Sequence, residues 1–465
     1  MLAADKETRI WRLGFFLIFA LALLTRFWNL GNFSYPVFDE TGYATMATQY
    51  LGEAAFIDVH PPVARFIFAL LAKISGARAS DRFPTSEAAY GDFPYWLLRG
   101  ASALAGVLLV MFIMLLTKEA TQSYVAGLLA GFLALFENFL VVQSRYILAD
   151  IFLVLFGVMG LWFFLKKDRE IFKTRKWYLW LVLASVFFSL AIGVKVSGVV
   201  FLLTSWFIHF FKTPKTERKT SIFSVFLVII PLLVVFTAMF VHFSLFNPEA
   251  PVWNHIEVGR ESTVTEIFEK LRVQNPFLKF GPQIGLFGER LLESSFGLLL
   301  TVASHFEEFE HRDYASPWYA WPFMIKPITV VNESAINGQK TISFFGNPII
   351  WWGGIVALIF ILAKRLSKGE FKNADFLILG YVFNLALMAL SPRELFIYHY
   401  LPSLIFLISI TAIALSKIIA LRPKISLGLL ALVLASFIFF SPLTYGTTLS
   451  KAALEWRIWL PSWQP

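Results

Sequence analysis

The sequence contains no cysteine among its 465 residues. Disulfide bonds, thiolate metal sites and a cysteine nucleophile are therefore excluded within this chain. Charged residues are also scarce, at 15% of the chain against about 25% in soluble globular proteins, whereas 57% of the residues are hydrophobic. This composition predicts an all-α polytopic membrane protein, in which each isolated charged group needs an explanation.

Several motifs that carry chemistry are absent as well. There is no Walker loop, no dinucleotide-binding fingerprint and no nucleophile elbow, so a nucleotide-driven mechanism is disfavoured. The histidines follow no metal-binding spacing such as His-x-x-x-His. We therefore predict no metal site and no required cofactor, with any need for a divalent cation left open. The lack of a basic face or binding module argues against a nucleic-acid partner.

Hydrophobic runs, in contrast, are abundant. A helix that crosses a bilayer needs about 20 mainly apolar residues. The first run ends without a small-residue cleavage site, so we expect it to be retained as a span and not removed as a signal peptide. About eleven candidate spans result, at 13–30, 97–117, 122–141, 146–165, 178–194, 196–211, 222–244, 348–363, 375–390, 396–416 and 425–443.

The short loops indicate the orientation, because cytoplasmic loops are enriched in Lys and Arg. With the N-terminus in the cytoplasm, basic loops recur on one side of the membrane and the C-terminus lies outside. The two long loops, 31–96 and 245–347 (between spans 7 and 8), then both lie on the outer side of a single membrane domain, 1–465. In these loops we expect interfacial helices at 41–51, from Pro62 onward, near 263–272 and near 284–304.

Two adjacent carboxylates, Asp39 and Glu40, follow the first span. In a chain with few charges, they indicate chemistry at the membrane surface, such as general-base catalysis. The alternative is structural, with Asp39 as the N-cap of the helix predicted at 41–51. His60 precedes two prolines, and it is either a site residue or a hydrogen-bonding strut of that turn.

Isolated cations mark the outer ends of several spans. Arg145 either binds an anion or pairs with Asp150, since unpaired charges are costly at membrane depth. Lys195 either binds phosphate or extends its ammonium group to the interface. Arg393 either binds phosphate or pairs with Glu394. Together with Arg99, these cations fit a reaction in which a base removes a proton while cations hold an anion.

The motifs also occur in a familiar order. The acidic pair and segment 56–62 are followed by an arginine-aspartate segment at 143–150 and a lysine-x-x-glycine turn at 195–198. The later motifs are 311–322, which begins at His311, 346–352, which contains Asn347, and 393–402, which contains Tyr398 and His399. In sequence and order this set resembles the protein O-mannosyltransferases.

The resemblance implies the GT-C membrane fold and transfer of mannose, with inversion, from a polyprenyl-phosphate carrier to Ser or Thr hydroxyls of exported proteins. It implies Asp39 as the base and Glu40 as a residue that orients the acceptor or helps to hold the base. Arg145, Lys195 and Arg393 would bind the donor phosphate. Further candidate site residues are His60, Arg99, Asp150, His311, Asn347, Tyr398 and His399.

The expected partners are then the lipid-linked sugar donor, an acceptor protein and membrane lipids, with the oligomeric state left open. The 245–347 loop has no room for the β-trefoil domain of eukaryotic members, which points to a compact prokaryotic enzyme in the plasma (inner) membrane whose site faces outward. Arg312 departs from the family pattern, because a proline usually follows the histidine. Two other functions are compatible with the chain, namely transfer to lipid A or another glycolipid, and secondary transport.

Overall fold

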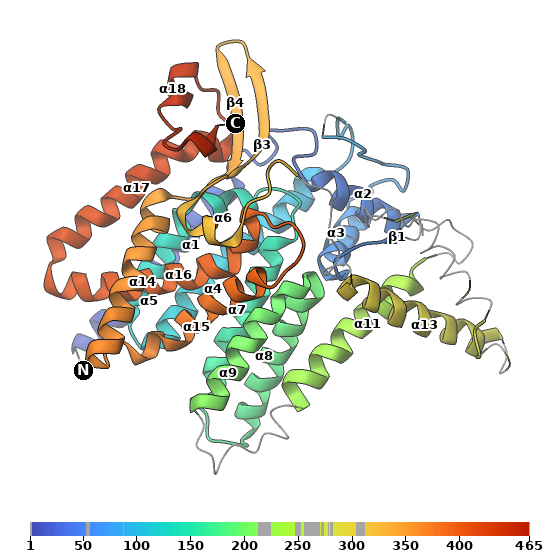
Figure 1. The fold of residues 1–465 in the computed structure, drawn as a ribbon, viewed down its shortest axis with the longest axis horizontal. Helices are drawn as coiled ribbons and strands as arrows, with labels where there is room; N and C mark the ends of the chain where they lie inside the picture. Colours follow the sequence, from blue (N-terminus) through green and yellow to red (C-terminus); the bar gives the residue numbers. More distant parts are fainter. Residues whose placement is uncertain are drawn as a thin grey trace.

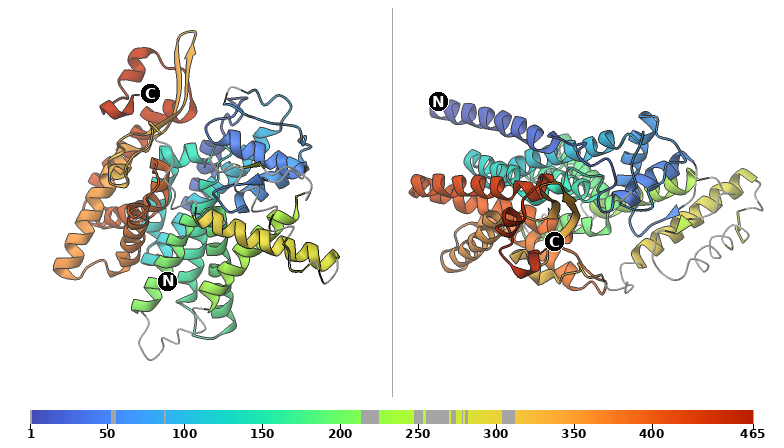
Figure 2. Two further views of the ribbon diagram at one scale, coloured as in Figure 1. Left: turned by 45° about the vertical axis from the view of Figure 1, so that its right-hand side comes forward. Right: turned by 90° about the horizontal axis from the view of Figure 1, so that it is seen from above.

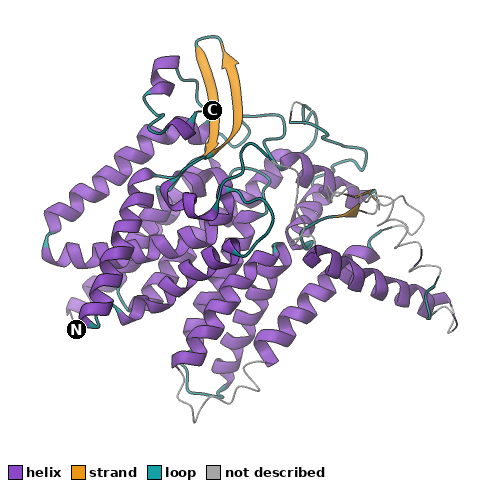
Figure 3. Ribbon diagram, in the orientation of Figure 1, coloured by secondary structure: helices purple, strands orange, loops and turns teal. Residues whose placement is uncertain are grey.

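The computed structural model describes residues 2–52, 56–86, 88–212, 225–246, 253–254, 270, 274–277, 279, 282–303 and 312–464. These residues form a bundle of α-helices, to which a few short strands are added (Figure 1, Figure 3). The chain enters through α1 (Leu2–Phe27), and its two ends lie at opposite ends of the bundle in Figure 1. The all-α membrane architecture predicted from composition is confirmed.

Within the described part of the chain, seven helices are long and apolar enough to cross a membrane. The central ones, α4 and η7–α16, are mostly buried, whereas α1 and α17 lie at the periphery and expose apolar faces suited to lipid (Figure 2). Each predicted span range contains a helix, but the total of about eleven spans stays a prediction. The seven helices are α1, α4 (Tyr95–Thr121), α8 (Arg175–Val194), η2–α11 (Val225–Ile229 and Ile230–Ser244), α14 (Pro348–Lys368), η7–α16 (Ile397–Tyr400 and Leu401–Leu421) and α17 (Pro423–Tyr445).

The remaining helices of the bundle are α5 (Tyr124–Leu135), α6 (Asn138–Gln143), α7 (Asp150–Lys167), α9 (Val199–Lys212) and α15 (Asp375–Ala389). Helices α8 and α9, which hydropathy separates poorly, are divided at Lys195 and the 3-10 turn η1 (Val196–Gly198). An added Cβ at Gly198 would lie 2.5 Å from the carbonyl carbon of Ala191, so only glycine fits this tight turn.

The continuous span predicted at 122–141 is wrong, because the helix breaks between α5 and α6. At the break, Arg26 donates hydrogen bonds of 3.0 Å to the carbonyls of Ala134 and Leu135, which are the last turn of α5. The Glu137 carboxylate accepts from the amides of Leu140 (2.6 Å) and Asn347 (2.9 Å). A cation therefore closes the C-terminal end of one helix and an anion the N-terminal end of the next, which matches both helix dipoles and satisfies the free backbone groups.

The first long loop, 31–96, contains α2 (Glu40–Leu51), β1 (Phe56–Ile57) and α3 (Val63–Ile74). Both helices predicted in this loop are present, and α3 begins directly after Pro62; their position at the membrane surface stays a prediction. The apolar faces of α2 and α3 pack against each other, for example through Tyr43 and Phe68. This packing fixes the start of α2, where the acidic pair lies.

The second long loop, 245–347, contains α13 (Pro282–Ala303), η5 (Trp318–Phe323) and a hairpin of β3 (Ile328–Ala335) and β4 (Gly338–Phe344). Helix α13 confirms the stretch predicted near 284–304, whereas the stretch near 263–272 lies outside the described residues except for Lys270. Strand β1 pairs in parallel with β2 (Trp253–Asn254). The hairpin was not predicted; it projects beyond the helices beside the C-terminal α18 (Lys451–Glu455) and η8 (Pro461–Trp463) (Figure 1).

Candidate functional site

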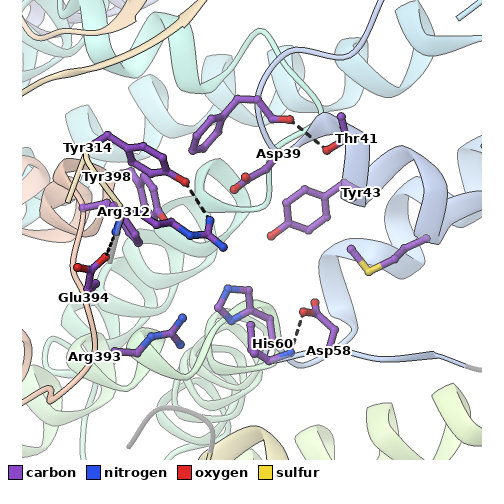
Figure 4. A pocket seen from close by; sticks show the side chains of 15 residues that line it. Asp39, Thr41, Tyr43, Asp58, His60, Arg312, Tyr314, Arg393, Glu394 and Tyr398 are labelled. Carbon is purple, nitrogen blue, oxygen red and sulfur yellow. Dashed lines mark hydrogen bonds between the residues drawn. The ribbon is translucent and has the colours of Figure 1, made fainter. Parts of the chain in front are cut away.

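A pocket of about 270 Å³ lies where the two long loops, 31–96 and 245–347, meet one end of the helical bundle. Its walls come from distant parts of the sequence: the start of α2, the turn at 58–60, the segment at 312–314 and the segment at 393–398. Figure 4 shows Asp39 and Asp58 on one side of the cavity and the guanidinium groups of Arg312 and Arg393 on the other, with Glu394 beside the two arginines. The charged side chains of the lining are Asp39, Asp58, His60, Arg312, Arg393 and Glu394.

Asp39 lies at the N-cap position of α2, but its side chain makes no capping hydrogen bond. Instead the carboxylate points into the pocket (Figure 4). It is exposed to the cavity, yet protein surrounds it, and this desolvation raises the pKa of the Asp39 carboxyl to about 6; Lys195 opposes the shift. The preceding Phe38 has a φ of 56°, a costly conformation for a bulky residue. Such strain beside a perturbed carboxyl is typical of functional sites.

Glu40 points the opposite way, into the protein. It is fully buried and forms an ion pair with Arg99, with Glu40 Oε1 2.8 Å from Arg99 Nε and Oε2 2.7 Å from Nη2. Its two oxygens also accept from the amides of Val37 and Ile147, each at 2.7 Å. Arg99 in turn donates to the carbonyl of Phe33. Of the two roles considered for Glu40, this geometry favours holding the segment that carries the base, because the carboxylate faces away from the cavity.

The side chains of Arg145 and Lys195 form hydrogen bonds and an ion pair within the protein. Arg145 donates to the carbonyls of Arg26, Trp28 and Asn29 at 2.6–3.1 Å, so the pair considered between Arg145 and Asp150 is wrong. Asp150 pairs with Lys195 instead, at 2.8 and 2.9 Å. The Lys195 ammonium lies 5.2 Å from the ring of Tyr398, on which it acts as a cation over an aromatic face.

The guanidinium groups that reach the pocket belong to Arg312 and Arg393 (Figure 4). Arg312 is positioned by its amide, which donates to Glu394 (2.7 Å), and by its Nη1, which donates to the hydroxyl of Tyr314 (2.9 Å). Desolvation lowers the pKa of Arg393, while the nearby Tyr398 and Asp58 raise it. A half-buried arginine that faces a cavity is suited to bind an anion.

Of the remaining candidates, His60 and Tyr398 line the pocket, while Asn347 and His399 are engaged elsewhere. Asn347 belongs to the helix break, where its side chain donates to the carbonyls of Phe136 and Val433. The Nδ1 of His399 accepts from the amide of Phe396. His311 lies outside the described residues. Within the part of the chain that the structure describes, no three His, Asp or Glu side chains are arranged to hold a metal ion.

Three lining residues were missed in the sequence. Arg312 was noted as a departure from a motif, and a cation in that position is the signal that could have identified it. Tyr43 follows Asp39 by four residues, so it lies on the same face of α2 and presents its hydroxyl to the cavity (Figure 4). Asp58 is in the turn before α3 and forms an ion pair with the buried Arg65.

Comparisons with known proteins match the chain in two parts, one N-terminal and one C-terminal. Residues 16–247 match a family model described as dolichyl-phosphate-mannose-protein mannosyltransferase, and residues 295–463 match the C-terminal four TMM region of protein-O-mannosyltransferase. Mannosyltransferase 4 of Schizosaccharomyces pombe is 31% identical over 46% of this chain, a match that spans only 29% of that longer relative. The polyprenol-phosphate-mannose–protein mannosyltransferase of Corynebacterium glutamicum is 25% identical, and the match covers 99% of this chain and 95% of that protein.

The fold agrees with these matches. The Saccharomyces cerevisiae protein O-mannosyltransferase Pmt1-Pmt2 complex bound to the sugar donor superposes with a TM-score of 0.79 over 98% of this chain and 93% of that chain, at 17% identity. The likeness at this low identity establishes a shared GT-C architecture. Because the two family models together extend from residue 16 to residue 463 and the fold is shared, the chain belongs to the protein O-mannosyltransferase family.

Proposed function

We propose that this chain transfers a mannosyl residue from a polyprenyl-phosphate-mannose donor to Ser or Thr hydroxyls of exported proteins. The observation that carries the proposal is the opposition, across one pocket, of the Asp39 carboxylate to the guanidinium groups of Arg312 and Arg393. A base on one side and cations on the other are the two requirements of a single displacement at a sugar phosphate. Because phosphate is a good leaving group, no protein nucleophile is needed.

The reaction proceeds in one step. Asp39 accepts the proton of the acceptor hydroxyl while the hydroxyl oxygen attacks the anomeric carbon of mannose. The bond from that carbon to the phosphate oxygen breaks, and the electron pair leaves with the polyprenyl phosphate. Arg393 and Arg312 stabilise the negative charge that develops on the phosphate, and the attack from the opposite face inverts the anomeric centre.

The roles of Lys195 and Arg145 in donor binding remain predictions. Lys195 contributes its charge to the Asp39 environment, while Asp150 holds its ammonium group. We place the pocket on the outer face of a prokaryotic plasma membrane, within a single membrane domain whose loops 31–96 and 245–347 build the site. The basic residues of the short loops on the other side support this orientation. Glycolipid modification and secondary transport are disfavoured by the family membership.

The proposal is tested by incubating the purified, full-length protein with polyprenyl-phosphate-mannose and a Ser/Thr-rich peptide. Mass spectrometry should detect one added hexose per modified hydroxyl, and digestion with linkage-specific mannosidases should report the inverted configuration. Parallel reactions with polyprenyl-phosphate-glucose and with a glycolipid acceptor serve as comparisons. Addition of hexose to the glycolipid but not to the peptide would contradict the proposal.

The raised pKa of Asp39 predicts a defined pH dependence. Only the ionised carboxylate accepts a proton, so kcat/KM should rise with pH, with a midpoint near the folded-state pKa of about 6, and level off above it. Activity is thus present above this pKa and lost as the pH falls through it. Initial rates at subsaturating peptide, measured between about pH 5 and pH 8, give the midpoint. A rate independent of pH over that interval would exclude Asp39 as the titrating base.

A further inference from the structure

The β3–β4 hairpin has one strand edge that is paired and one that is open. On the side of β4, the amide and carbonyl of Gln339 exchange hydrogen bonds with Leu449, at 2.8 and 2.9 Å. On the other side, β3 has β4 as its single strand partner among the described residues. Figure 1 shows the open edge of β3 on the side of the hairpin where α2 and the first long loop lie.

The register identifies which backbone groups point toward this open edge. In an antiparallel pair, opposed residues alternate between those that bond each other and those whose amides and carbonyls point outward. Gln339 bonds Leu449 on the far side, so the Ser334–Gln339 pair is of the outward kind. Two residues along, the Asn332–Thr341 pair is of the same kind. The amides and carbonyls of Ser334 and Asn332 therefore face outward on β3, and both residues are exposed.

The edge leads toward the pocket. Phe344, at the end of β4, pairs with Ile328 at the start of β3, and its ring lies 5.0 Å from that of Phe38 in an edge-to-face contact. Phe38 lines the pocket and directly precedes Asp39. At about 3.3 Å per residue, an extended chain needs roughly four residues to pass from the level of Asn332 to the base of the hairpin at Ile328, and roughly six from the level of Ser334.

The edge carries few of the features that usually prevent strands from pairing: Glu333 is the one charged residue of β3, and its carboxylate accepts a hydrogen bond from the Tyr35 hydroxyl. Natural edge strands carry proline, lysine or bulges that block further pairing. Strand β3 contains no proline and no lysine, and its irregularity lies near the base, between Thr329 and Val331, which leaves the outer part regular. An unprotected edge beside a catalytic pocket is suited to receive an extended peptide through main-chain hydrogen bonds, which require no particular sequence.

We propose that the outer edge of β3, at Asn332 and Ser334, binds an extended segment of the acceptor polypeptide as an added strand and thereby delivers its Ser or Thr to Asp39. The inference rests on the proposed function, since it assigns the polypeptide substrate of the same pocket a second binding surface. It explains how an enzyme can retain acceptors of differing sequence, because the added strand is held through its backbone. Specificity then depends on the acceptor being unfolded and long enough to reach both surfaces.

The variant Ser334→Pro tests this proposal, and Ser334→Ala is its matched control. Proline removes the outward N–H at an edge position that tolerates it, whereas alanine removes the hydroxyl and keeps the N–H. With a long acceptor peptide, S334P should raise the peptide KM about three- to tenfold, leaving the donor KM and kcat unchanged, while S334A should behave as the wild type. With an acceptor of about four residues, too short to reach the edge, S334P and the wild type should be equal.

A second measurement keeps the test independent of how well S334P folds. Long peptides carrying a single N-methyl residue, scanned outward on each side of the acceptor Ser, are given to the wild-type protein. N-methylation should raise KM at alternate positions, about four and six residues from the Ser, and be tolerated at the position between them. An unchanged peptide KM in S334P with no alternation in the scan would overturn the proposal, as would a shift in oligomeric state alone, which would assign the edge to a second copy. If the wild type modifies neither peptide, the proposed function itself fails.

Discussion

Replacing Asp39 with asparagine is expected to lower kcat by about 10²–10⁴, which would bring transfer close to the background rate. The amide has the shape of the carboxylate but cannot accept the hydroxyl proton. The Asp39 side chain makes no capping hydrogen bond, so removal of its negative charge should leave the start of α2 unaffected. Donor KM should change little, because the cations lie on the opposite wall of the pocket. Initial rates with saturating donor and peptide provide the measurement.

The matched control for Asp39→Asn is Asp92→Asn in the same loop, 31–96. The Asp92 side chain is 90% exposed and pairs with the exposed Arg78, so its neutralisation should leave both activity and folding intact. Thermal unfolding of both variants in detergent, followed by light scattering, separates inactivation from misfolding. Turnover of D39N within about fivefold of the wild type would remove Asp39 as the base.

Replacing Arg393 with glutamine is the second change with a large expected effect, a fall in kcat of about 10²–10³. The guanidinium faces the pocket, and its charge opposes the one that develops on the leaving phosphate. Glutamine has a shorter side chain that still donates hydrogen bonds but carries no charge. Because the stabilisation is larger in the transition state than in the bound donor, kcat should fall more than donor KM rises. Arg312→Gln should produce a change of the same kind.

Arg365→Gln is the control for Arg393→Gln. Arg365, in the last turn of α14, forms an ion pair of 2.7 Å with Asp375 at the start of α15. This partly exposed pair contributes little to stability. Loss of its charge should leave kcat and both KM values unchanged. If R393Q lowers kcat by less than threefold while R312Q lowers it strongly, Arg312 is the main phosphate-binding residue and the assignment to Arg393 is wrong.

The helical bundle could be predicted because the length of each hydrophobic run can be read from the sequence alone. The start of α3 could be predicted as well, because it is set by the neighbouring Pro62. The break in the span at 122–141 could not, since it depends on Arg26, which is distant in sequence. Apolar residues on both sides of the break hide it from hydropathy. The hairpin was missed although the sequence carries its signal, a run of β-branched residues at 328–331 followed by Asn337-Gly338, a pair typical of hairpin turns.

The candidate site, too, could be predicted only in part. The acidic pair could be found from its position, but the sequence treats Asp39 and Glu40 alike, whereas the structure turns one into the pocket and buries the other against Arg99. Where an isolated cation points depends on contacts brought by distant segments. Arg145 donates to three backbone carbonyls, whereas Arg393 lines the pocket, and neither placement is encoded in the neighbouring residues.

The division of the pocket between the two halves of the chain affects when the enzyme becomes active during its own synthesis. The acidic wall, with Asp39 and Asp58, belongs to the segment made first, and the cationic wall, with Arg312 and Arg393, to the segment made last. A chain still emerging from the ribosome, with only its early spans inserted, has a base but no means of activating a sugar phosphate. The two walls therefore come together only after Arg393 has been made, so the complete pocket belongs to the nearly finished chain.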